Sequence, residues 1–155
     1  MKRGVVSWPN EAERVALSVE IGQLSGFPHC VGFIDGTTFR LACRPQLDGE
    51  AYFSRKSQYC ISGQIVCDNN RLVRSMIIGY PGSVHDSRQW RSMKLCVNSS
   101  KYFSPSEYLL GDSAYSLSQH LVPPYKKPLS LQCRNRAFNY LLAESRITVE
   151  HTIGI

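Results

Sequence analysis

The sequence predicts a mixed α/β fold, in which one central sheet is flanked by helices. Three observations indicate this class: a short, fully apolar run at residues 30–34, two longer apolar segments joined by a polar turn, and amphipathic helical segments near both ends. The chain has 155 residues, of which 43% are hydrophobic. That is enough for one domain with a buried core.

The first part of the chain, residues 1–28, is expected to be a helical segment that precedes the main domain, residues 29–155. A helix over residues 8–24 is predicted because apolar and charged residues interleave there, and it ends at Gly26-Phe27-Pro28. The apolar run at residues 30–34 predicts a buried strand closed by a turn at Asp35-Gly36, with a second extended piece over residues 39–43.

A β-hairpin is predicted over residues 59–80, because the turn at residues 68–71 consists mainly of Asp and Asn, which tolerate left-handed backbone. A helix from His85 through Leu95 should follow, with Asp86 or Ser87 as its N-cap. Residues 108–111 predict a further strand, residues 114–122 a loop or short helix, and residues 128–135 a loop. The last segment, residues 137–155, predicts a helix capped by Asn135 that is still running at the final residue. This order gives a mixed sheet with a crossover connection.

Composition excludes several classes of protein. The formal charge is +6, from 18 Lys and Arg against 12 Asp and Glu, which favours an anionic partner such as nucleic acid. No uncharged stretch reaches the roughly 18 residues of a membrane span, and the N-terminus lacks the apolar region of a secretory signal. The six cysteines form no CxxC pair, so they predict reduced thiols rather than a zinc or redox site.

Two of the predicted strands end in a carboxylate, Asp35 and Asp112. If these strands are neighbours, the two acids face each other, and carboxylates that close need a proton or a cation between them. Oxygen ligands favour Mg²⁺ or Mn²⁺ over zinc. A third acid is available on the last helix, where Glu150 lies one turn after Arg146. The alternatives are that each Asp only forms a turn, and that Glu150 is an exposed helix partner of Arg146.

Four segments together resemble the PIF/Harbinger transposases and the nucleases derived from them, a family with a DDE superfamily endonuclease domain. The resemblance runs from about Cys30 to the last residue and is carried by residues 32–37 (GFIDGT), 79–88 (GYPGSVHDSR), 110–115 (LGDSAY) and 146–154 (RITVEHTIG). It implies an RNase H-like fold. Family members usually continue past the glutamate helix, so the catalytic domain is expected to be truncated at its C-terminus.

The resemblance also implies a function: metal-dependent cleavage of DNA phosphodiester bonds by a transposase-like hydrolase. Its catalytic and metal-binding triad would be Asp35, Asp112 and Glu150, holding two Mg²⁺ or Mn²⁺ ions. Asp86, His85 and Arg146 are candidates for additional or supporting roles, although an N-cap role for Asp86 is favoured. The family further implies DNA as the partner and the nucleus as the location, and it leaves open a separate DNA-binding partner protein and a homo-oligomer.

Basic and aromatic residues are the candidates for DNA contact. Arg88, Arg91 and Lys94 recur every three residues and should line one side of a helix, and Arg55 and Lys56 lie in a predicted loop. Four aromatic residues could stack on exposed bases: Tyr52, Phe53, Trp90 and Tyr115. The alternatives are a solvated surface for the cations, and, for the whole chain, either a catalytically inactive DNA- or protein-binding relative or a ribonuclease or resolvase of the same fold.

Overall fold

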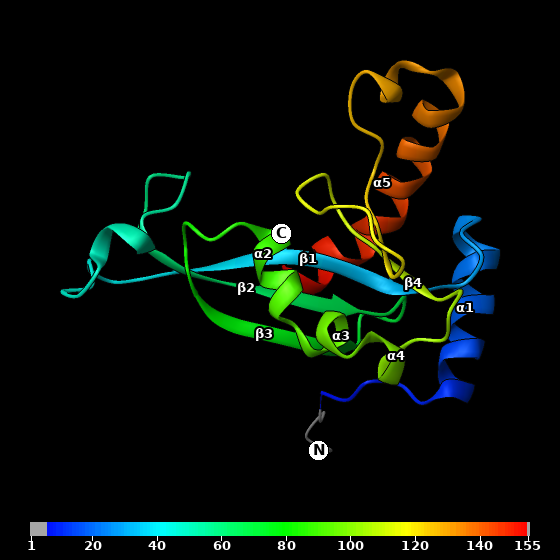
Figure 1. Cartoon of the computed structure of the whole chain (residues 1–155), viewed down its shortest axis with the longest axis horizontal. Helices are drawn as coiled ribbons and strands as arrows, with labels where there is room; N and C mark the ends of the chain where they lie inside the picture. Colours follow the sequence, from blue (N-terminus) through cyan, green and yellow to red (C-terminus); the bar gives the residue numbers. More distant parts are fainter. Residues whose placement is uncertain (1–5, 155) are drawn as a thin grey trace.

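A five-stranded mixed sheet forms the centre of the molecule in the computed structural model, which describes residues 6–154 (Figure 1). The strand order is β3-β2-β1-β4-β5. Neighbours β1–β2 and β2–β3 are antiparallel, whereas β1–β4 and β4–β5 are parallel. The predicted mixed α/β class, with a crossover from the hairpin to a parallel strand, is confirmed. The strands are β1 (Cys30–Arg40), β2 (Cys60–Cys67), β3 (Val73–Pro81), β4 (Tyr108–Leu110) and β5 (Leu121–Val122).

The first helix, α1 (Glu11–Ser25), begins and ends on clear local signals. Asn10 and Glu13 form a reciprocal capping box, which satisfies backbone N–H groups at the helix start. Gly26 ends the helix in the left-handed region, with φ of 78°, where a residue with a side chain would be strained. The predicted helix is confirmed, and it packs directly on β1.

Helices cover both faces of the sheet. On one face, α1 and α5 (Cys133–Ile153) pack on β1, and Ile21, Phe33, Leu142 and Val149 belong to the core between them. On the other face lie α2 (Asp86–Ser92), α3 (Lys94–Val97) and α4 (Ser99–Tyr102). The residues Trp90, Met93, Leu95 and Phe103 bury this second face against the sheet.

The β2–β3 hairpin is as predicted, and its turn is fixed by one buried carboxylate. Asp68 accepts hydrogen bonds from the backbone N–H groups of Asn70 and Leu72, and its other oxygen binds Arg74 Nε at 2.7 Å. Because Asp68 is fully buried, these bonds replace the water that the carboxylate loses on folding.

Several predicted boundaries were wrong. Strand β1 does not stop at Asp35-Gly36 but continues to Arg40, because residues 33–40 all pair with β2. The helix expected over residues 85–95 breaks at Met93, whose backbone is extended (φ −68°, ψ 140°). Residue His85, not Asp86 or Ser87, is the N-cap of α2. These corrections place Asp35 in the middle of a long strand and leave the side chain of Asp86 available for another contact.

The C-terminal part of the chain also differs from the prediction. Helix α5 begins at Cys133, with Gln132 as N-cap, so Asn135 lies inside the helix and donates to Leu129 O. The helix ends at Ile153, because Gly154 adopts the left-handed region, with φ of 84°. The segment expected as a loop or short helix contains β5, and the segment expected as a loop contains the 3₁₀ helix η2 (Leu129–Leu131).

Residues 41–59, here called the arm, extend away from the body of the molecule beyond the ends of β1 and β2 (Figure 1). The arm contains the 3₁₀ helix η1 (Gly49–Tyr52) and closes on itself through a bridge between Phe53 and Tyr59. In the described residues, no helix is long and apolar enough to cross a membrane.

Candidate active site

A cleft opens where β1 loses its parallel neighbour. Strand β4 pairs with β1 only as far as Leu110, opposite Phe33, whereas β1 continues for seven more residues. In this register, Asp112 lies beside Asp35 just past the end of β4. The sequence-based expectation that these strands are neighbours is therefore confirmed, and Asp35 and Asp112 both line the cleft, which has a volume of about 600 Å³.

Asp35 faces the α5 side of the sheet. Its neighbour Ile34 belongs to the core on the α2 side, and successive side chains of a strand alternate between faces. One oxygen of Asp35 accepts from Gly36 N at 2.9 Å, and the other pairs with Arg146 of α5 at 3.1 Å. Burial raises the pKa of Asp35 to about 6; Asp112 and Asp86 act in the same direction, and Arg146 opposes them.

Asp86 is a third carboxylate of the cleft, which the sequence offered as a candidate additional acid. It lies in the first turn of α2, and its Oδ1 accepts from Gln64 Nε2 of β2 at 2.7 Å. The carboxylate packs directly over the backbone of Gly36, where an added Cβ would lie 2.6 Å from Oδ1. Burial raises the pKa of Asp86, and the charge of Asp112 adds to the effect. The N-cap role that we favoured for Asp86 is wrong, and Asp86 instead joins Asp35 and Asp112 in the cleft.

Asp112 sits in the turn that follows β4. Its Oδ1 accepts from Ala114 N at 2.9 Å, a local bond of the kind expected of a turn-forming Asp. The turn is also tied to α2, because Ser87 Oγ donates to Ala114 O. Asp112 therefore both shapes its turn and faces the cleft, so the two interpretations of this residue are compatible.

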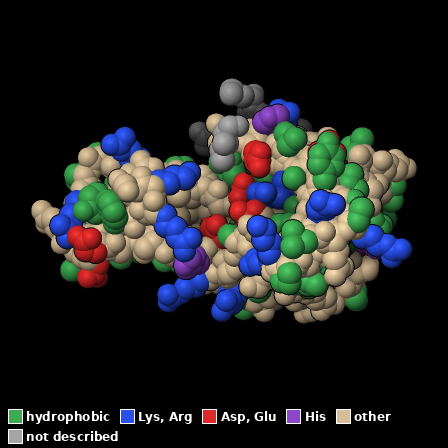
Figure 2. All heavy atoms as spheres, turned by 90° about the horizontal axis from the view of Figure 1, so that it is seen from above, with side chains coloured by type: hydrophobic (Ala, Val, Ile, Leu, Met, Phe, Trp, Pro, Cys, Tyr) green, Lys and Arg blue, Asp and Glu red, His purple; other side chains and the backbone are tan. Residues whose placement is uncertain are grey.

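Cations from the arm form one wall of the cleft. Arg55, Lys56 and His85 line it, and Arg55 lies 3.1 Å from His85 Nε2. Figure 2 shows acidic side chains gathered between the arm and the body of the molecule, with Lys and Arg side chains beside them. Arg88, Arg91 and Lys94 are exposed but are not among the described residues that line the cleft, and the helix break at Met93 separates Lys94 from the other two.

Glu150 is half-buried on α5 and is not among the described residues that line the cleft. It lies one turn after Arg146, which reaches Asp35, and three residues before Ile153, which lines the cleft. Residues at these spacings share a helix face. Arg146 pairs with Asp35, and no ion pair with Glu150 forms among the described residues, so the alternative of Glu150 as a helix partner of Arg146 is not observed.

Two of the aromatic residues proposed to stack on bases are unavailable for it. Tyr115 is fully buried and Trp90 is 5% exposed, so their roles are internal. Tyr115 donates its hydroxyl hydrogen to Gln64 Oε1, and Gln64, also fully buried, is the residue that sequence reasoning missed. A polar residue inside an apolar strand was the only signal that could have indicated it.

The donor chemistry of the cleft fits a hard divalent cation, because its acidic groups are all carboxylates and two of them have raised pKa values. Within residues 6–154, however, no three Asp, Glu, His or Cys side chains come close enough together to hold one ion.

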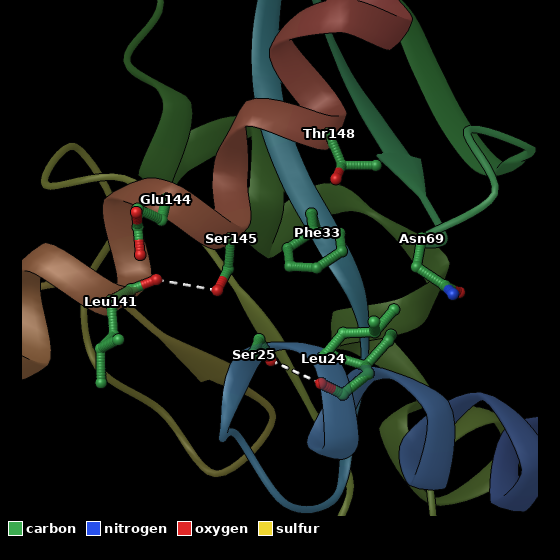
Figure 3. Close-up of a pocket in the computed structure, with 9 residues that line it drawn as sticks. Leu24, Ser25, Phe33, Asn69, Leu141, Glu144, Ser145 and Thr148 are labelled. Carbon is green, nitrogen blue, oxygen red and sulfur yellow. Dashed lines mark hydrogen bonds between the residues drawn. The ribbon is translucent and has the colours of Figure 1, made fainter.

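A second pocket, of about 220 Å³, lies between α1 and α5 on one face of the sheet (Figure 3). Phe33 forms its floor, and Leu24 and Leu141 lie on opposite sides. Its one charged lining residue among the described positions is Glu144, so it does not offer the grouped acids of the cleft.

Fold and site together define a mixed α/β domain with an acidic cleft where β4 ends beside the central strand β1. The chain belongs to the DDE superfamily endonuclease family, whose model matches residues 34–155. This confirms the family predicted from the four sequence segments.

Curated relatives agree with this assignment. The chain is 30% identical over 149 residues to "Protein ALP1-like" of Arabidopsis thaliana, covering 81% of this chain and 34% of that protein. It is 26% identical over 119 residues to "Putative nuclease HARBI1" of Homo sapiens, covering 77% of this chain and 34% of that protein. The chain thus spans about a third of the length of these relatives. No solved structure matches it.

Proposed function

We propose that the chain is the catalytic domain of a divalent-metal-dependent DNA endonuclease with an RNase H-like fold. The strand order supports this fold, because an antiparallel hairpin is followed by parallel strands on the other side of β1. The observation that carries the function is that Asp35, Asp86 and Asp112, which are far apart in sequence, line one cleft with two cations of the arm.

Asp35, Asp112 and Glu150 are proposed as the catalytic triad, with Asp86 as an additional acid. Bound Mg²⁺ or Mn²⁺ would supply activation of water and stabilisation of the leaving oxygen. The protein's own part is to hold the carboxylates: Gly36 N fixes one oxygen of Asp35, Gln64 fixes one oxygen of Asp86, and Ala114 N fixes one oxygen of Asp112. Arg146 offsets part of the negative charge at Asp35.

Arg55 and Lys56 are proposed to bind the phosphates of the DNA, because they are exposed and line the same cleft as the acids. From family membership we further propose DNA as the partner and the nucleus as the location. A separate DNA-binding partner protein, a homo-oligomer and DNA contacts by Arg88, Arg91 and Lys94 stay predictions.

Nicking of supercoiled plasmid DNA in Mg²⁺ or Mn²⁺ tests the proposal. Asp35→Asn, Asp112→Asn and Glu150→Gln should each abolish nicking, because each removes a charged ligand. Glu144→Gln is the matched control, since Glu144 is exposed on the same helix and hydrogen-bonded to Tyr140. Undiminished nicking by all three variants would contradict the proposal.

A second function is favoured by one observation, the pairing of Arg146 with Asp35 in a cleft that brings no three ligands together among the described residues. A relative that binds DNA without cutting it would show salt-sensitive DNA binding and no metal-dependent nicking. The same plasmid assay, combined with a binding titration, separates the two functions.

A further inference from the structure

A chain of hydrogen bonds between buried side chains leads from the turn after β4 to the acid of α2. Tyr115 donates its hydroxyl hydrogen to Gln64 Oε1, and Gln64 Nε2 donates to Asp86 Oδ1 at 2.7 Å. The three residues come from three different parts of the fold: the turn after β4, strand β2 and helix α2. None of them is near another in sequence.

The order of donors and acceptors in these two hydrogen bonds follows from the chemistry of the three side chains. A carboxylate can only accept, so the amide nitrogen of Gln64 must face Asp86, and the amide oxygen is left to face Tyr115. The tyrosine hydroxyl then donates to that oxygen. Without Tyr115, the amide oxygen of Gln64 would be buried without a partner, and the side chain would lose the contact that fixes its orientation.

Burial makes the arrangement rigid. Tyr115 and Gln64 are both fully buried, so water does not compete for their hydrogen bonds. Two glycines provide the space: a Cβ at Gly111 would lie 2.7 Å from the Tyr115 ring, and a Cβ at Gly36 would lie 2.6 Å from the Asp86 carboxylate. The ring of Tyr115 and the carboxylate of Asp86 thus each pack against bare backbone.

The same turn carries Asp112. The backbone N–H of Tyr115 donates to Asp112 O, and Ala114 N donates to the Asp112 side chain. The turn therefore fixes Asp112 directly and Asp86 through Tyr115 and Gln64.

We propose that Tyr115 and Gln64 are positioning residues, which fix the orientation of the Asp86 carboxylate beside Asp112 in the cleft. Through this orientation they set the affinity of the site for a divalent cation. The inference about cation affinity rests on the proposed function. The positioning of Asp86 does not require a cation, so the two parts can be tested separately.

The first test uses no metal. In the wild-type chain, the side-chain NH₂ protons of Gln64 should exchange slowly with solvent, as measured by NMR, because they are buried and hydrogen-bonded. Tyr115→Phe removes only the hydroxyl and should speed this exchange at least about 10-fold, an effect of about 1.4 kcal/mol. Tyr108→Phe is the matched control, because Tyr108 lies on β4 and no hydrogen bond of its hydroxyl is found among the described residues. Equal exchange in wild type and Tyr115→Phe would overturn the proposal.

The second test is Mn²⁺ binding by titration calorimetry. Tyr115→Phe and Gln64→Met should each weaken Mn²⁺ binding about 10-fold, which is the usual effect of losing a group that orients a ligand. Tyr108→Phe should bind like wild type. Gln64→Met keeps the side-chain volume and provides an independent variant if Tyr115→Phe unfolds.

A double-mutant cycle separates positioning from general damage. In an Asp86→Asn background, Tyr115→Phe should cause no further loss of Mn²⁺ affinity, because its effect passes through the Asp86 carboxylate. A full 10-fold loss in that background would overturn the proposed route. If the wild-type chain binds no Mn²⁺, the proposed function and the inference about affinity are both wrong, and the exchange experiment alone decides the positioning of Asp86.

Discussion

The surroundings of Asp35 disfavour the charged form of its carboxylate. Burial raises the pKa of Asp35 to about 6. The charge of Arg146 lowers this pKa, and the charges of Asp112 and Asp86 raise it further. An Asp in an unfolded chain has a pKa of about 4. The folded state therefore binds a proton more tightly than the unfolded state. The stability from this proton is complete below pH ~4 and is lost as the pH rises through about 6.

Replacing Asp35 with Asn should remove this loss. Without metal, the wild-type chain is expected to lose on the order of 2–3 kcal/mol more unfolding free energy than Asp35→Asn between pH ~4 and ~7. Urea unfolding of both proteins at the two pH values, in chelator, measures the difference. Parallel pH profiles would show that the Asp35 carboxylate is not destabilised by its surroundings.

Gly36 is the residue that permits Asp86 to approach β1. In Gly36→Ala, the new Cβ would lie 2.6 Å from Asp86 Oδ1, so the carboxylate must leave its hydrogen bond with Gln64. We expect a loss of about 1–3 kcal/mol in unfolding free energy together with weaker Mn²⁺ binding. Gly22→Ala in α1 is the control, because its Cβ would meet only ordinary contacts at 3.6 Å and alanine favours the helix. Equal stability of the two variants would contradict the close packing at Gly36.

At the same scale, the sequence indicated part of the site and not the rest. Asp35 and Asp112 were predictable because each follows an apolar run, and the two runs form neighbouring parallel strands, although β1 continues past Asp35. Asp86 was only a candidate for an additional role, and its contact with Gln64 could not be predicted, since it joins α2 to β2, which are distant in the sequence. The local signal favoured an N-cap role for Asp86, because Asp is common at that position, whereas the N-cap is His85.

Among the elements, the turn of the β2–β3 hairpin is stabilised by one residue, Asp68. Asp68 holds two backbone N–H groups of its turn and the guanidinium of Arg74. We expect Asp68→Ala to reduce the unfolding free energy by about 1–3 kcal/mol, because it removes the acceptor of two backbone N–H groups and of Arg74. Asn70→Ala, at an exposed position of the same turn, should change it by less than about 0.5 kcal/mol. Thermal unfolding of both variants makes the comparison, and a similar effect of the two would contradict the role of Asp68.

The ends of helices and strands were predicted well where a local sequence signal marks them. They were predicted poorly where hydrogen bonding to a neighbouring strand determines them. The end of α1 at Gly26 was predicted, whereas its start lies at Glu11, after the capping box of Asn10 and Glu13, rather than at residue 8. In contrast, β1 runs through Asp35-Gly36 because β2 supplies hydrogen-bond partners as far as Arg40, which the local Asp-Gly pair does not reveal. The two-residue β5 exists only because it pairs with β4. Such strands carry too few residues for a periodic pattern.

Over the whole molecule, the net charge is +6, and in the cleft three acids lie beside two cations of the arm. Arg55 and Lys56 of the arm line the cleft, whereas Lys101 lies on α4 with its amine over the Tyr102 ring. Both lysines are exposed. Their different positions allow the effect of the cleft to be separated from the effect of total charge.

Lys56→Ala should therefore weaken DNA binding and reduce its dependence on salt, whereas Lys101→Ala, with the same loss of charge, should change neither. Each phosphate neutralised on duplex DNA contributes about 0.9 to the slope of log K against log salt. The slope should thus fall by about one for Lys56→Ala. Fluorescence anisotropy with a labelled duplex at several salt concentrations measures both quantities in Ca²⁺ or chelator, so that cleavage does not interfere. If the two variants lose affinity equally, the DNA is held by the general positive charge and the arm does not form the binding wall of the cleft.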